Sequence, residues 1–202
     1  MFAQIIRAKV SDQEAVRAAE ARWFDGVSPG AKGWLGATSG VTEDGRLFVM
    51  ARFDSEGSAR ANSARPEQDS WWTEFSKLID GDVTFRDSNN VLVEATGDMD
   101  SAGFVQIIAG QSKDLNRSRE IMTEMAALRG AGRPEILGSV SVGHEDGMFT
   151  HVLFFTSEEE ARIGERKEPP PEAKALLDEM MALGEGAPEF LDLKTPSLRS
   201  PK

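Results

Sequence analysis

The stretch Phe2-Ala-Gln-Ile-Ile6 recurs as Phe104-Val-Gln-Ile-Ile108, 102 residues further on and with four of the five positions identical. The same offset, without a gap, matches Glu43-Asp-Gly45 with Glu145-Asp-Gly147 and continues through Arg60 and Arg162. A match held over roughly sixty residues indicates an internal duplication. The chain of 202 residues is therefore expected to consist of two similar units rather than one large domain.

Both copies predict the same order of secondary structure. An apolar strand precedes an amphipathic helix, whose N-cap is Ser11 or Asp12 in the first copy and Asp114 in the second. A hairpin with an Asp-Gly turn follows, then a proline-interrupted helical region and a short last strand. The predicted strands are residues 2–10, 34–41, 47–53 and 83–87 in the first copy, and 104–110, 136–142, 148–155 and 189–193 in the second.

The order β-α-β-β-α-β is that of the ferredoxin-like arrangement, in which both helices cover one face of a four-stranded antiparallel sheet. The first strand is apolar on both of its faces, so the second face of each sheet also needs a cover. We therefore expect an α+β protein in which two tandem ferredoxin-like units pack sheet to sheet, as two subunits would in a dimer.

The expected boundaries follow from these elements. Residues 1–87 form the first repeat and residues 102–195 the second. Residues 88–101 are a polar linker whose Val91-Leu92-Val93 run could add an edge strand, and residues 196–202 are a flexible C-terminal tail.

Composition narrows the possible partners and chemistries. The formal net charge is -11, and residues 1–101 contribute -6 from 11 basic and 17 acidic side chains. Because nucleic acids and anionic membranes require clustered Lys and Arg, neither is an expected partner. There is no cysteine and no tyrosine, and only two histidines, so thiol and phenol chemistry are excluded. No leader or membrane-spanning segment is recognised, which favours a cytoplasmic monomer with an internal pseudo-dimer, further self-association being left open.

The step from third strand to second helical region reads Phe53-Asp-Ser-Glu56 in one copy and Phe155-Thr-Ser-Glu158 in the other. With the order of elements and the tandem arrangement, it resembles the dimeric α/β-barrel superfamily, and within it the antibiotic biosynthesis monooxygenase-like proteins. The resemblance implies an intrachain dimeric α/β barrel. Because no set of ligands for haem, flavin or a metal is visible in the sequence, no such cofactor is expected. The resemblance also implies a cavity in which an asparagine and a tryptophan hold a polycyclic phenol, and Asn62 and Trp72 match that pattern. The tyrosine of some relatives is absent, which puts quinone-forming oxygenation in doubt.

Differences between the copies single out further candidates in the first copy. Arg52 and Arg86 lie on strands where the second copy has Phe154 and, after a three-residue insertion, Leu191. Arginines in a covered sheet need a carboxylate or an anionic ligand as partner. Two interpretations stay open: exposed arginines paired with neighbouring aspartates, or arginines that bind a ligand.

Trp72 and His151 also carry two interpretations each. With the constant offset, Trp71 aligns with Ala173 and is expected in the core, whereas Trp72 aligns with Lys174 and is either a surface aromatic or the cover of a cavity. His151 shares a strand face with apolar residues and is either a core histidine or a proton acceptor.

Two functions of different class are compatible with these residues. The first is a cofactor-independent monooxygenase-like enzyme that acts on a small hydrophobic or aromatic metabolite in the first copy. The second is a non-catalytic module of the same fold that binds such a molecule or serves as a scaffold. In either case we expect the ligand site in the first copy, because only there do aromatic and polar candidates occur together.

Overall fold

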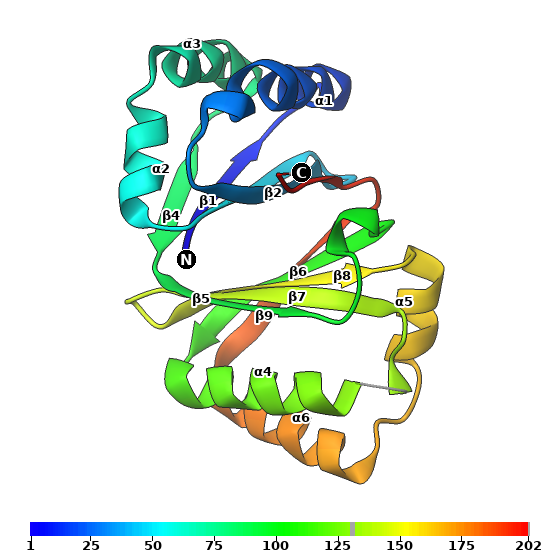
Figure 1. Ribbon diagram of the computed structural model, residues 1–202. Coiled ribbons are helices and arrows are strands. Elements are labelled where there is room, and N and C mark those ends of the chain that lie inside the picture. Colours follow the sequence, from blue (N-terminus) through cyan, green and yellow to red (C-terminus); the bar gives the residue numbers. More distant parts are fainter. Residues whose placement is uncertain (130–131, 202) are drawn as a thin grey trace. The chain divides into compact units, whose positions relative to one another are not determined.

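The computed structural model describes residues 1–129 and 132–201 of the protein. It divides into two compact units (Figure 1). The first comprises Met1–Asn89 together with the C-terminal residues from Thr195, and the second comprises Asn90–Lys194. Each unit is a five-stranded antiparallel sheet with helices, which confirms the predicted α+β fold class.

The first unit has the sheet order β10-β2-β3-β1-β4. Figure 1 shows its helices gathered on one face of that sheet. The strands are β1 (Phe2–Lys9), β2 (Trp34–Val41), β3 (Arg46–Phe53), β4 (Thr84–Ser88) and β10 (Ser197–Arg199). The helices are α1 (Gln13–Arg22), the π-helical turn η1 (Trp23–Val27), η2 (Ser28–Gly30), α2 (Glu56–Ser63), α3 (Pro66–Phe75) and η3 (Ser76–Leu78).

The second unit repeats this plan with the order β5-β7-β8-β6-β9. Its strands are β5 (Asn90–Ala95), β6 (Phe104–Ser112), β7 (Ile136–Gly143), β8 (Met148–Phe155) and β9 (Gly184–Leu193). Its helices are η4 (Met99–Ser101), α4 (Leu115–Arg129), α5 (Glu158–Glu165) and α6 (Pro171–Leu183). Without β10 and β5, both sheets have the 2-3-1-4 order of a ferredoxin-like unit. Packing of the two sheets against each other stays a prediction.

The fifth strand of each sheet comes from outside the repeat that builds the other four. Strand β5 follows the first repeat, in the stretch expected to be the linker, and pairs with β7 of the second unit. Strand β10 follows the second repeat and pairs with β2 of the first unit. The expectation that residues 196–202 form a flexible tail is therefore wrong, because Ser197–Arg199 hydrogen-bond to a sheet edge that would otherwise stay open.

Equivalent residues start and stop the elements in both units. The carboxylates of Asp12 and Asp114 accept hydrogen bonds from backbone N–H groups three residues on, both at 2.9 Å, and so cap α1 and α4. Gly45 and Gly147 both adopt φ = +80° in the hairpin turns, a backbone conformation in which glycine carries no steric cost. The helix caps and the hairpin turns are thus equivalent in the two units.

The first strand of each repeat also carries the same glutamine amide, which is half-buried at Gln4 and buried at Gln106. Gln4 Nε2 donates to Asp87 of β4 at 3.4 Å, and Gln106 Nε2 donates to Asp192 of β9 at 3.1 Å. Each glutamine faces its aspartate directly in the strand register. In both units this amide therefore joins the central strand to the last strand of the four-stranded repeat, which is a structural role.

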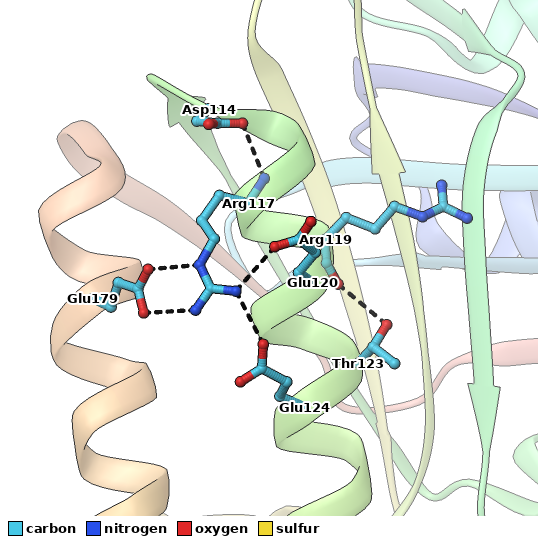
Figure 2. Close-up of polar contacts among 7 residues, drawn as sticks. All are labelled: Asp114, Arg117, Arg119, Glu120, Thr123, Glu124 and Glu179. Atoms are coloured by element: carbon cyan, nitrogen blue, oxygen red, sulfur yellow. Dashed lines mark hydrogen bonds and ion pairs between the residues drawn. The ribbon is translucent and has the colours of Figure 1, made fainter.

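In the second unit, Arg117 joins two helices (Figure 2). Its guanidinium donates to both carboxylate oxygens of Glu179 on α6, at 2.6 and 2.8 Å. The same guanidinium donates to Glu120 and Glu124 on its own helix α4, both at 3.0 Å. A bidentate pair of this kind fixes orientation as well as distance, so it holds α4 and α6 side by side.

None of the helices in the described residues is both long and apolar enough to traverse a bilayer.

Candidate functional site

The first unit contains a cavity of about 270 Å³ between its sheet and its helices. Seven aromatic side chains from η1, β3, α3 and β4 line much of it, and they are Trp23, Phe24, Phe53, Trp71, Trp72, Phe75 and Phe85. Its polar lining includes Gln4, Glu20, Ser39, Asn62, Gln68 and Asp69. The second unit has a much smaller hollow, of about 40 Å³. The larger cavity therefore lies in the copy in which we expected the ligand site.

Helix α3 supplies the largest part of the aromatic lining. Trp71 and Phe75, four residues apart on one helix face, stack with ring centroids 4.7 Å apart. The indole N–H of Trp71 donates to the backbone carbonyl of Ala19 at 2.8 Å, which joins α3 to α1. Trp72 packs against Phe75 at 5.7 Å and against Phe85 of β4 at 5.5 Å. Trp72 lines the cavity, but whether it binds a ligand stays a prediction.

The alignment of Trp72 with Lys174 is wrong. Helices α3 and α6 begin at Pro66 and Pro171, 105 residues apart, so the three-residue insertion precedes the helix. Trp71, Trp72 and Phe75 accordingly correspond to Leu176, Leu177 and Met180. The lysine comparison therefore gives no reason to expect Trp72 to be dispensable for stability, since its true counterpart is apolar.

Asn62 lines the cavity from α2 and is buried. Its amide nitrogen donates to Gln68 Oε1 at 3.2 Å, and its oxygen accepts from Arg65 at 3.0 Å. The Trp23 indole N–H also donates to Gln68 Oε1, at 2.7 Å. Asn62 and Trp72 thus share one cavity, as their resemblance to the family pattern implies, but the Asn62 amide is already engaged by protein groups.

Arg52 and Arg86 lie on the opposite face of the sheet, so the suggestion that they share a site with Asn62 and Trp72 is wrong. Arg52 stands opposite Ala3 of β1, and Arg86 stands opposite Ile5. Alternate residues of a strand point to opposite faces, and it is Gln4 and Ile6 that line the cavity. Both arginines therefore point away from the cavity.

His151 lies in the second unit and lines its small hollow. The ring is buried, and its Nδ1 lies 2.7 Å from the hydroxyl of Ser141. Its counterpart in the first unit is Val49, which lines the large cavity. His151 thus belongs to a different unit from the other candidates, and it is hydrogen-bonded within the sheet of that unit.

Sequence reasoning missed Glu20 of α1, which lines the cavity and is only 6% exposed. Burial raises its pKa from the ordinary 4.5 to about 7. The hydroxyls of Ser39 and Ser197 and the charge of Arg17 oppose this shift in part. Within the described residues, Glu20 Oε1 is buried without a hydrogen-bond partner. The cavity therefore holds a carboxyl group that can gain or lose a proton near neutral pH.

A signal for Glu20 was present in the sequence. Val16, Glu20, Trp23 and Val27 follow helical spacing along one apolar stripe, so the carboxyl had to face the sheet. At the constant offset its counterpart is Met122, which lines the small hollow of the second unit. The first copy thus has an ionisable residue, Glu20, where the second has an apolar one, Met122. The same kind of difference between the copies made Arg52 and Arg86 candidates.

No protein-family model and no curated protein matches the sequence. Solved structures do match over nearly the whole chain. A candidate monooxygenase from Fusobacterium nucleatum has 9% identity and a TM-score of 0.79, and the alignment covers 98% of this chain and 94% of that one. An anthrone oxidase-like protein has 11% identity and a TM-score of 0.67, with 98% and 92% covered.

A ferredoxin-fold protein from Listeria monocytogenes, related to antibiotic biosynthesis monooxygenases, also aligns over the full chain. It has 11% identity and a TM-score of 0.52, with 100% of this chain and 96% of that one covered. The resemblance to monooxygenase-like proteins of ferredoxin-like fold is thus confirmed at the level of the fold.

The raised pKa of Glu20 predicts a pH-dependent stability. In the folded protein Glu20 keeps its proton up to about pH 7, whereas in the unfolded chain it loses it near 4.5, so ionisation at higher pH favours unfolding. The stability contributed by the neutral acid is complete below pH 4.5 and is lost as the pH rises through 7. Denaturant titrations should show Glu20→Gln gaining about 3 kcal/mol relative to wild type between pH 4.5 and 8. A stability difference that does not change with pH would contradict the raised pKa.

Proposed function

We propose that the first unit binds a small, flat aromatic molecule and acts on it as a cofactor-independent monooxygenase-like enzyme. The observation that carries the proposal is a cavity with seven aromatic side chains and one buried acid whose pKa is raised to about 7. An apolar lining with a few convergent polar groups is the usual form of a small-molecule site. The shared fold with monooxygenase-like proteins supports it.

The lining favours an aromatic ligand over an aliphatic one. Trp71, Trp72 and Phe75 form a stack into which a further ring can pack, with offset or edge-to-face geometry. Gln68 Oε1 already accepts from Trp23 and Asn62, so its amide nitrogen remains to donate to a carbonyl or hydroxyl of the ligand. The role of Asn62 in this arrangement is to orient Gln68.

Glu20 supplies the chemistry that the absent tyrosine cannot. As a carboxylate it accepts a proton from an acidic C–H that lies between aromatic rings and is conjugated with a carbonyl group. The resulting carbanion is electron-rich enough to react directly with dioxygen. The hydroperoxide formed after reprotonation loses water, so one oxygen atom enters the product as a carbonyl and the other leaves as water. Substrate and dioxygen supply all the atoms and electrons.

Anthrone is a suitable probe because it is flat, aromatic and a carbon acid, and because a structural neighbour is anthrone oxidase-like. All four tryptophans lie in the first unit, and three of them line the cavity. Since the chain has no tyrosine, its intrinsic fluorescence reports on this unit alone. Quenching on titration therefore measures binding at the proposed site.

Phe85 and Phe190 provide a matched pair of variants. They stand opposite Ile6 and Ile108 in equivalent registers and are 52% and 50% exposed, so neither is needed for the core. Only Phe85 lines the cavity. Phe85→Ala should weaken anthrone binding about tenfold, equivalent to about 1.4 kcal/mol of lost aromatic contact, and Phe190→Ala should leave it unchanged. Equal affinities of the two variants would place the ligand elsewhere.

Glu20→Gln separates catalysis from binding. The variant should bind anthrone with near wild-type affinity. Its rate of oxygen consumption, after subtraction of the protein-free rate, should be about 10²- to 10⁴-fold lower than that of wild type, because it lacks the proton acceptor. For wild type, the rate should rise with pH through about 7, as Glu20 ionises. Oxygen uptake is followed with an electrode. Tight binding by wild type without any uptake would instead support the non-catalytic binding module.

A further inference from the structure

The C-terminal strap, defined as residues 195–201, belongs to the first unit although it follows the second repeat. Its strand β10 pairs antiparallel with β2, so that Ser197 stands opposite Ser39 and Arg199 opposite Ala37. Ser39 and Ala37 both line the cavity. The strap therefore closes the edge of the sheet next to the proposed site.

Two contacts and the strand register connect the strap with residues around Glu20. Arg17, one turn before Glu20 on α1, donates to the hydroxyl of Thr195 at 2.5 Å. The guanidinium of Arg199 lies 5.5 Å from the ring centroid of Phe24, a cavity residue. Ser197 stands opposite Ser39, which lines the cavity together with Glu20, and both hydroxyls lower the pKa of the Glu20 carboxyl group in part. Glu20 thus lies over the pair formed by β2 and β10.

We propose that the strap completes the site of the first unit, with Ser197 as a positioning residue that orients the Glu20 carboxyl group while the strand around it excludes water. The proposal rests on the proposed function for its catalytic meaning. Through it, residues that follow the second repeat in the sequence become part of the site of the first unit. Nothing in the constant offset between the copies indicates this, because Ser197 lies beyond the end of the repeat.

The strap acts on Glu20 in two opposite ways. The Ser197 hydroxyl stabilises the carboxylate and so lowers its pKa, whereas exclusion of water destabilises the carboxylate and raises it. The charged groups around Glu20 are Arg17 on its own helix, Asp69 of α3 in the cavity lining and Arg199 of the strap. None of these is altered by a substitution of Ser197. The two effects can therefore be separated by mutation.

The test is a ¹³C NMR titration of the Glu20 carboxyl group in the ligand-free full chain. Ser197→Ala removes only the hydroxyl and should move the titration midpoint to higher pH than wild type. Ser197→Thr restores a hydroxyl and should return the midpoint to the wild-type value. Ser200→Ala is the matched control. Ser200 also lies on the strap, but its hydroxyl lies beside Gly36 of β2, so this variant should not shift the midpoint. A midpoint in Ser197→Ala equal to that of Ser200→Ala would overturn the positioning role.

Deletion of residues 195–202 should shift the midpoint in the opposite direction, from about 7 towards 4.5, because water then reaches the carboxyl group. A midpoint that stays near 7 would overturn the water-excluding role. Should the shortened chain fail to fold, the comparison of Ser197→Ala with Ser197→Thr decides alone. The pH at half-maximal oxygen uptake should follow the same shifts.

The titration needs no ligand, so the two proposals fail separately. Shifts as expected without any anthrone binding would refute the proposed function but leave the strap's role intact. Anthrone binding with no shift in any variant would refute the strap and leave the cavity as the site.

Discussion

The central strand of each sheet imposes the constraint on which the rest of the structure depends. In the first unit, β1 lies between β3 and β4 and is hydrogen-bonded along both edges, so its side chains must alternate between the two faces of the sheet. Gln4 and Ile6 face the cavity, whereas Ala3 and Ile5 face the other side. The same alternation assigns every neighbouring side chain, and it excludes Arg52 and Arg86 from the cavity.

The two units share one backbone plan but differ in the side chains that line their hollows. Where α3 carries Trp71, Trp72 and Phe75, α6 carries leucines and methionine, and the hollow beneath it shrinks to about 40 Å³. The serine of the second strand stays the same in both units, but its surroundings differ. Ser39 lines the large cavity together with Glu20, whereas the Ser141 hydroxyl lies 2.7 Å from His151 Nδ1. Each unit thus has one titratable side chain in the hollow beside that serine, but only the first has an aromatic cavity around it.

Much of the fold was predictable because its signals are local and repeated. The capping aspartates, the Asp-Gly turns and the apolar first strands appear twice at a constant offset, so each copy supports the other. Placement of the insertion failed because Pro169, Pro170 and Pro171 are all acceptable at a helix start, and sequence alone does not choose among them. Strand β10 was missed because three residues show no periodicity.

The site was less predictable than the fold for a physical reason. Glutamate usually marks the solvated face of a helix, so Glu20 attracts attention only when its place on an apolar stripe is counted. Conversely, arginines on strands look like ligand contacts until the register shows which face they take. Residue type was thus a weaker guide to the site than position within the helix or strand.

The central claim is that the aromatic cavity of the first unit is the ligand site, and isotope-filtered NOE spectroscopy of the anthrone-bound protein tests it most directly. The account predicts intermolecular NOEs from anthrone ring protons to the indole protons of Trp71 and Trp72 and to the ring of Phe85, since all three line the cavity. NOEs confined to second-unit residues such as His151 and Phe149 would contradict it.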